Sequence, residues 1–190
     1  MPRAKESLER VIADANRACK VIERVRSLTS NVTPERLELD INAIVKEVLA
    51  VTRSELQARQ VSLDVELSDD VPAVVGDKVQ LQQVVLNLVM NAVDAMAAVT
   101  GRPHVLTIKS QCGDSGALVT VQDCGAGLDP ATAERIFQPF FTTKPGGMGM
   151  GLSISASIME SHGGRLWACP AQPCGTAFHF SLPGARSGEP

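Results

Sequence analysis

The chain has 190 residues, of which 44% are hydrophobic, 21% charged and 3% aromatic, and its formal net charge is −3. A chain of this length forms one sizeable domain without disulfides or structural metals, and it leaves room for an extra helix or tail. The slight negative charge argues against a nucleic-acid binder that neutralises phosphates, and the shortage of aromatic residues argues against the stacking of single-stranded bases.

The sequence predicts neither a membrane span nor a secretory signal. The longest apolar stretch, residues 84–93, is interrupted by two Asn residues and falls well short of the ~20 residues that a membrane helix needs. The five cysteines form no C-x-x-C pair, and their odd number is simplest to explain in a reduced, cytosolic compartment. Tethering of a longer protein to the membrane is left open.

The N-terminal segment is expected to form one long amphipathic helix over residues 4–29. Apolar residues recur there at three- and four-residue steps, and the opposite face is charged. The apolar stripe contains small residues, so the helix can pack either on its own domain or in a coiled-coil or four-helix dimer interface. The pattern does not decide between these two arrangements.

Predicted helices and strands are mixed in the rest of the chain. In chain order they are a helix over 41–59, strands over 61–67 and 73–75, a helix over 78–96, strands over 105–111 and 117–122, a short helix over 131–136, a helix over 152–161, and strands over 165–168 and 176–182. Asp40 is placed to cap the first helix, and Asp77 with Gln80 forms a capping-box pattern before the second. The strict alternation over 61–67 predicts a half-buried strand. The whole pattern predicts an α+β fold, with one mostly antiparallel sheet under a helical layer.

A narrow polar stripe runs along the otherwise apolar helix over 78–96. Its members are Gln80, Gln83, Asn87, Asn91 and Asp94. Asn is a poor helix former, and solvated helix faces usually carry Lys and Glu instead. A short neutral amide can hold a divalent cation by its carbonyl oxygen. The stripe therefore favours a functional face over a merely solvated one.

Asp123 stands at the end of a predicted strand and is followed by Gly125 and Gly127. This order places a carboxylate at the mouth of a pocket, where glycines let the backbone pass close to a ligand. An ionised carboxylate only accepts hydrogen bonds, so it suits a donor such as an exocyclic amine. A tight turn built on two glycines explains the motif equally well.

A third motif covers residues 137–152, where three Phe residues precede a glycine-rich segment. Gly147, Gly149 and Gly151 lead directly into a predicted helix, and the N–H groups at such a helix start form a cradle for anions. The segment does not end in the G-K-[ST] of a Walker A loop, and no strand precedes it as in a Rossmann turn. A flexible linker is the alternative, but it does not account for the three Phe residues.

In this order, the motifs resemble the Bergerat-fold ATP-binding superfamily, which includes type II topoisomerases, heat-shock chaperones, mismatch-repair ATPases and sensor histidine kinases. The resemblance is strongest to the catalytic and ATP-binding domain of histidine kinases, and it implies that family's two-layer α/β sandwich. Residues 140–144 (Phe-Phe-Thr-Thr-Lys) and 163–166 (Gly-Gly-Arg-Leu) are typical of the nitrogen- and oxygen-sensing type. The expected units are a partial dimerisation and phosphoacceptor hairpin helix (1–30), a linker (31–39), the ATP-binding catalytic domain (40–183) and a tail (184–190).

The resemblance also implies roles for individual residues. It makes Asn91 the Mg²⁺ ligand, Asn87 a neighbour of the phosphates, and Asp123 the acceptor for the adenine amine of ATP. Thr176 becomes a second contact on the adenine side, and Lys144 the cation that the ATP lid (residues 128–150, "the lid" below) brings to the phosphates. The pocket and the phosphate-proximal box are completed by Gly125, Gly127, Gly147, Gly149, Gly151 and Leu152.

One position departs from the family pattern. Many relatives have a basic residue three positions after the Mg²⁺-binding Asn, whereas this chain has Asp94. A phosphate contact from that position is therefore in doubt, and Lys144 or Arg135 has to supply the positive charge.

The implied reaction is transfer of the γ-phosphoryl group of ATP to a histidine, within a two-component phosphorelay. In the ATPase branches of the superfamily a glutamate at the position of Asn87 activates water, and Asn cannot act as such a base. His104, His162 and His179 are the three histidines, and each is expected to be structural. The acceptor histidine is therefore expected on a dimerisation helix outside this chain.

The implied partners are the acceptor-histidine hairpin, the receiver domain of a response regulator and, in the full-length protein, a second copy of the chain. Three alternatives stay open at this point. The chain could be a nucleotide-binding regulatory module without transfer activity, another Bergerat-fold ATPase, or a protein kinase of the mitochondrial dehydrogenase type.

Overall fold

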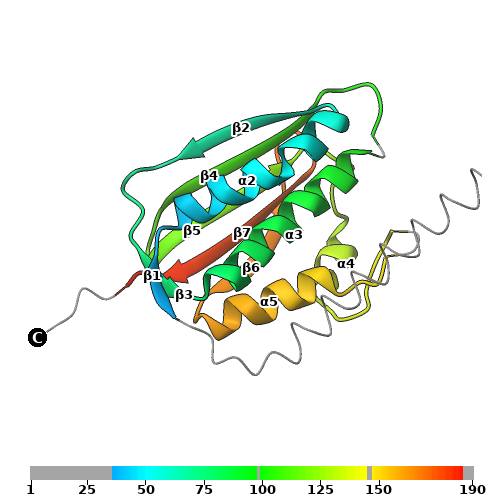
Figure 1. Ribbon diagram of the computed structural model, residues 1–190. Helices are drawn as coiled ribbons and strands as arrows, with labels where there is room; N and C mark the ends of the chain where they lie inside the picture. Colours follow the sequence, from blue (N-terminus) through cyan, green and yellow to red (C-terminus); the bar gives the residue numbers. More distant parts are fainter. Residues whose placement is uncertain (1–35, 98, 145–146, 186–190) are drawn as a thin grey trace, which may run out of the picture. The chain divides into compact units, whose positions relative to one another are not determined.

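The computed structural model describes residues 36–185 apart from 98 and 145–146, so the helix expected over residues 4–29 lies outside the described part. Helices cover one face of a sheet there (Figure 1). The helices are α2 (Ile41–Ala58), α3 (Lys78–Ala97), α4 (Pro130–Ala133) and α5 (Gly151–Ser161). The strands are β1 (Leu37–Leu39), β2 (Val61–Leu67), β3 (Val74–Gly76), β4 (His104–Gly113), β5 (Gly116–Asp123), β6 (Arg165–Pro170) and β7 (Thr176–Pro183).

The main sheet has five strands in the order β2-β4-β5-β7-β6. The β2–β4 pair is parallel, and the other three pairs are antiparallel. The register places Leu106 opposite Asp123, and Val121 opposite Phe178. The prediction of a two-layer α+β fold with a mostly antiparallel sheet is therefore confirmed.

The core lies between the sheet and the helices α2, α3 and α5. Alternate residues of the central strands face the helices, and Ile108, Val119 and Phe180 are at most 1% exposed. The apolar face of α3 meets them, with Val85 and Leu88 fully buried. Burying each such side chain contributes about 1.5–3 kcal/mol, so this layer fixes the position of α3 and of its polar stripe.

Two strands differ from the predictions. Strand β2, at the edge of the sheet, is less buried than predicted, because the helical layer leaves its Leu63 and Val65 exposed. Strand β1 lies within the predicted linker 31–39 and pairs antiparallel with β3, with Glu38 opposite Val75. The sequence did not predict this strand, since three residues are too few to show the alternation of a strand.

The start of α3 forms only half of the predicted capping box. The carboxylate of Asp77 accepts hydrogen bonds from the N–H groups of Val79 (2.9 Å) and Gln80 (3.1 Å). The N–H of Asp77 does not bond to the Gln80 side chain but donates to Nε2 of His162 (3.0 Å). The ring nitrogen Nδ1 of His162 lies 2.7 Å from the Ile158 carbonyl oxygen, so this histidine ties the C-terminus of α5 to the N-terminus of α3.

The other two histidines also have structural partners. Nε2 of His104 lies 2.9 Å from the carbonyl oxygen of Val99. His179 lies on β7, where Nδ1 is 2.9 Å from Thr120 Oγ1 and the ring stacks on Trp167. Burial lowers the pKa of His179, which favours its neutral form. Among the helices of the described residues, none has both the length and the hydropathy of a membrane span.

Candidate functional site

The polar stripe of α3 meets the first turns of α5. Nδ2 of Asn87 donates a hydrogen bond to Oγ of Ser155 (3.0 Å). A Cβ atom on Gly151 would lie only 2.4 Å from Oδ1 of Asn87, so only glycine lets α5 begin this close to the amide. The structure therefore brings together Asn87 and the end of the glycine-rich segment, two features that the sequence had linked only by family resemblance.

Lys144, the cation predicted for the lid, reaches across to the same helix. Its ammonium donates to Oδ1 of Asn91 and to Oδ2 of Asp94, both at 3.0 Å. The other oxygen of Asp94 pairs with the Arg59 guanidinium at 3.1 Å. Asp94, which departs from the family pattern, thus has two basic partners, one from the lid and one from the residue that follows α2.

Asp123 is 2% exposed at the end of β5, on the sheet face covered by the helices. Its Oδ1 accepts hydrogen bonds from the N–H groups of Gly125 (2.7 Å) and Thr176 (3.3 Å). Burial raises the pKa of the Asp123 carboxyl, against the opposing effect of these two N–H groups and of the charges of Arg102 and Lys144. Within the described residues Oδ2 has no hydrogen-bond partner, so this oxygen can accept a bond from a ligand.

The backbone packs closely around Asp123. Gly175 adopts φ +89°, and a Cβ atom there would lie 2.0 Å from the carbonyl oxygen of Asp123. On the other side, a Cβ atom on Gly125 would lie 2.8 Å from the backbone of Ala95 in α3. A Cβ atom on Gly127 would lie 3.4 Å from the carbonyl oxygen of Gly175. The carboxylate is thus held between α3 and the β6–β7 hairpin.

The phosphate-proximal box folds back on the lid. A Cβ atom on Gly149 would lie 2.5 Å from the carbonyl carbon of Phe140, and one on Gly147 would lie 2.6 Å from Oγ1 of Thr142. Leu152 packs against the edge of the core. The guanidinium of Arg135, the alternative cation for the phosphates, lies 4.5 Å from the centre of the Phe141 ring instead.

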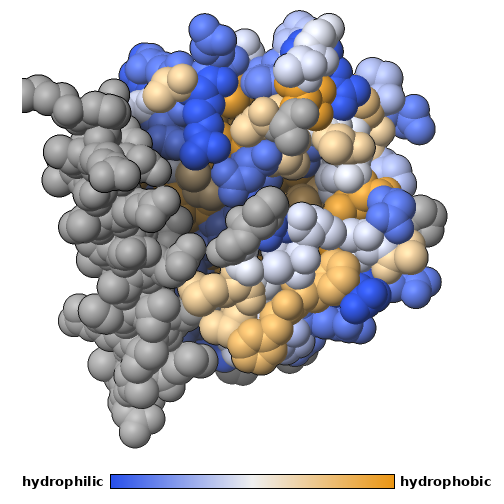
Figure 2. Space-filling model, turned by 90° about the vertical axis from the view of Figure 1, so that its right-hand side faces the viewer, coloured by the Kyte–Doolittle hydropathy of each residue, from blue (hydrophilic) through white to orange (hydrophobic). Residues whose placement is uncertain are grey.

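The end of the domain that carries the site has a mixed surface. Figure 2 views this end and shows hydrophilic and apolar side chains interspersed over it, with one apolar group near the bottom of the view. In the lid, Phe140 is 76% exposed and Met148 38%.

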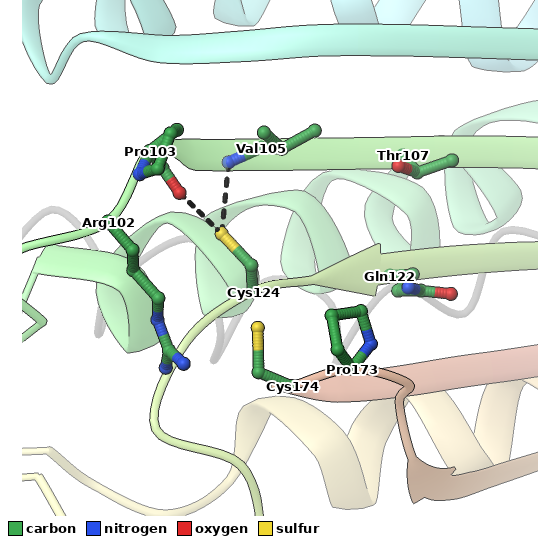
Figure 3. Close-up of a pocket in the computed structure, with 8 residues that line it drawn as sticks. All are labelled: Arg102, Pro103, Val105, Thr107, Gln122, Cys124, Pro173 and Cys174. Carbon is green, nitrogen blue, oxygen red and sulfur yellow. Dashed lines mark hydrogen bonds between the residues drawn. The ribbon is translucent and has the colours of Figure 1, made fainter.

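A cavity of about 420 Å³ lies behind Asp123 on the opposite face of the sheet (Figure 3). Its lining residues are Arg102, Pro103, Val105, Thr107, Gln122, Cys124, Pro173 and Cys174. The thiol of Cys124 donates to the Pro103 carbonyl oxygen (2.9 Å) and accepts from the Val105 N–H (3.1 Å). The strand positions that line this cavity alternate with those that face the core, so the sheet separates the cavity from the buried side chain of Asp123.

The sequence did not point to three residues at the site. Ser155 is 1% exposed on α5, and a polar residue on the buried face of that helix was the available signal. Arg102 donates to the carbonyl oxygen of Gly125, and Arg59 pairs with Asp94. Neither arginine belongs to a motif, because each contact joins segments far apart in the chain.

Comparison with known proteins identifies the family. The model of the histidine kinase-, DNA gyrase B- and HSP90-like ATPase family matches residues 76–186. The sensor histidine kinase TmoS of Ectopseudomonas mendocina is 37% identical over 182 residues, which cover 95% of this chain and 19% of TmoS. The chain thus spans about a fifth of that relative.

Two solved structures resemble the chain. The catalytic domain of histidine kinase ThkA, in a nucleotide-free form, is 32% identical with a TM-score of 0.70, and the match covers 78% of this chain and 95% of that domain. ThkA in complex with the response regulator protein TrrA is 26% identical with a TM-score of 0.75, and the match covers 92% of this chain and 49% of ThkA. The chain therefore belongs to the histidine kinase-, DNA gyrase B- and HSP90-like ATPase family, and within it to the catalytic domains of sensor histidine kinases.

Proposed function

We propose that this chain binds Mg²⁺-ATP and transfers its γ-phosphoryl group to a histidine on a dimerisation hairpin, as the cytoplasmic catalytic domain of a two-component sensor kinase. The observation that carries the proposal is the environment of Asn87. Its amide lies against the start of α5, with Nδ2 on Ser155 and Oδ1 beside Gly151. An amide cannot take a proton from water, so the site suits transfer to a better nucleophile than water.

Adenine recognition is assigned to Asp123 and Thr176. The two backbone N–H bonds orient the carboxylate through Oδ1, and the free Oδ2 accepts from the exocyclic amine. Thr176, which is 3% exposed, provides a second contact on the adenine side. The phosphates then extend toward the N-terminus of α5, where Gly147, Gly149 and Gly151 present N–H groups.

The residues present fit a divalent cation. Oδ1 of Asn91 already accepts from one cation, the Lys144 ammonium, and amide and carboxylate oxygens are the donors that Mg²⁺ prefers. Asn91 would hold the ion, which neutralises phosphate charge when bound. Lys144 then contacts the phosphates from the lid.

Slow hydrolysis is a direct expectation from Asn87. Purified chain is expected to bind ATP with negligible steady-state ATPase activity, because no side chain at that position can activate water. Phosphate release in a coupled assay measures this. Turnover near one per second, within ordinary enzyme rates, would contradict the kinase proposal and favour another ATPase of the family.

The transfer itself can be tested by supplying the acceptor. With γ-labelled ATP, the chain is expected to label a separately expressed hairpin that contains the acceptor histidine. It is not expected to label itself, since its own three histidines have structural partners. Acid-labile label on the chain alone would contradict the proposal. A response regulator receiver domain added afterwards is expected to take the label from the hairpin. We also propose that the full-length protein is a homodimer.

A regulatory module without transfer activity is the second candidate, and the pairing of Asp94 with Lys144 favours it. The Asp94 carboxylate pairs with the Lys144 ammonium, which is the cation that the reaction needs at the phosphates. The same mixing experiment separates the two functions. ATP binding without label on the hairpin supports the module, and labelled hairpin supports the kinase.

A further inference from the structure

Five side chains form a cluster that links the lid to the two long helices beside it. Lys144 of the lid contacts Asn91 and Asp94, which lie one turn apart on α3. Arg59, directly after α2, binds Asp94 through Nη1 (3.1 Å) and Glu55 through Nε (2.6 Å). The partners of Asp94 come from segments 35 and 50 residues away, so the cluster depends on tertiary structure.

Each oxygen of Asp94 has its own cationic partner. Oδ1 is taken by the guanidinium of Arg59, which leaves Oδ2 for the ammonium of Lys144. Glu55 binds the same guanidinium through Nε, so the acidic groups of Glu55 and Asp94 balance the basic groups of Arg59 and Lys144. Arg59 therefore favours the orientation of the Asp94 carboxylate in which its second oxygen faces the lid.

The position of Lys144 conflicts with the role proposed for Asn91. The Asn91 oxygen that accepts from the ammonium is the same oxygen assigned to the divalent cation. Two cations at one amide oxygen repel each other, so Lys144 has to leave when the metal and nucleotide arrive. Once released, its ammonium is free to reach the phosphates.

We propose that Asp94 is a positioning residue that, with Arg59, holds Lys144 on Asn91 until nucleotide binds, so that loading the site exchanges one cation for another. This inference rests on the proposed nucleotide site and adds to it a contact that holds the lid in the free protein. The side chains of Asp94 and Lys144 are 40% and 41% exposed. Exposed pairs contribute little, so releasing the contact should change nucleotide affinity by about two- to fivefold.

The test compares Asp94→Asn with Lys144→Met and the double variant. Hydrogen exchange of peptides over residues 140–152 is measured first, without nucleotide. Asp94→Asn is expected to raise exchange in these peptides, because Lys144 loses the charged one of its two partners on α3 and keeps only Asn91. Glu47→Gln is the matched control, since Glu47 forms a comparably exposed ion pair with Lys78 that joins α2 to α3 and does not involve the lid. This control is expected to leave lid exchange unchanged.

Affinity for Mg²⁺-ADP, measured by calorimetry, supplies the second readout. Asp94→Asn is expected to tighten binding about two- to fivefold in the wild-type background and to have no effect in the Lys144→Met background. Tightening that persists with Met at position 144 would mean that Asp94 only repels the phosphates. Weaker binding would make Asp94 a metal ligand, and either result overturns the proposal. Unchanged lid exchange in Asp94→Asn also overturns it. If the wild-type chain binds no nucleotide, the proposed function fails, and lid exchange alone decides whether the contact exists.

Discussion

Replacing Asp123 with Asn is expected to abolish nucleotide binding without unfolding the domain. In the variant, Oδ1 can still accept from the N–H groups of Gly125 and Thr176, so the local backbone keeps its partners. The position of Oδ2 becomes an NH₂ group. This group and the exocyclic amine of adenine are both hydrogen-bond donors, so neither can accept from the other. Losing a charge-assisted bond and burying two unpaired donors should weaken binding by about 100-fold or more, measured by calorimetry.

The Asp123→Asn variant is expected to lose nucleotide affinity but not folding stability. Burial raises the pKa of Asp123, so the folded protein holds this proton more readily than the unfolded chain does. The group therefore stabilises the fold at acid pH, and this contribution is lost as the pH rises through its raised pKa. At neutral pH the Asn variant avoids the buried charge and should unfold at equal or higher denaturant concentration.

The pH dependence of binding follows from the same group. Only the ionised carboxylate is a pure acceptor, so nucleotide affinity of the wild-type chain should fall as the pH is lowered through the raised pKa of Asp123. Asp114→Asn, in the exposed turn between β4 and β5, is the control and should bind as wild type does. An Asp123→Asn affinity within threefold of wild type would show that this carboxylate does not recognise the base.

Gly175→Ala is expected to be the most destabilising single change near the site. The residue has φ +89°, and the new methyl group would lie 2.0 Å from the carbonyl oxygen of Asp123, which is backbone and cannot rotate away. The β6–β7 hairpin would have to move, and the loss should be about 3 kcal/mol or more in the free energy of unfolding, measured by guanidinium denaturation. Nucleotide affinity should fall as well, because Thr176 moves with the hairpin.

Gly101→Ala provides the control for this variant. Gly101 has φ +85°, close to that of Gly175, but a Cβ atom there would meet nothing within 4 Å. Its variant should lose only about 1 kcal/mol, the cost of placing a side chain in the left-handed region. Equal losses in the two variants would mean that the close packing against Asp123 contributes nothing.

The sequence predicted the placement of those candidate site residues whose positions depend on local order. Asn87 and Asn91 fall on one face because helical periodicity is local, and Asp123 lies at a strand end because alternation stops there. The partners of these residues could not be predicted in the same way. Ser155 is 68 residues from Asn87, and Lys144 is 53 residues from Asn91, so only the packing of α3 against α5 and the lid brings them together.

In the fold, too, features that depend on local periodicity were predicted, and features that depend on contacts between distant segments were not. The long helices and central strands were predicted within a few residues, because each buries a face with its own period. Strand β1 was missed since a three-residue strand exists only through its pairing with β3. The capping box at Asp77 was half right, because the second partner is His162, 85 residues away, rather than Gln80.

That histidine also determines how α5 can move. His162 anchors the C-terminal end of α5 to the start of α3, and a Cβ atom on Gly76 would lie only 2.7 Å from its ring, so this end has little freedom. The other end, at Gly151, adjoins the lid about 16 Å away along an 11-residue helix. We expect any movement of α5 on nucleotide binding to be smallest at His162 and largest at Gly151, where it would change the contact between Ser155 and Asn87.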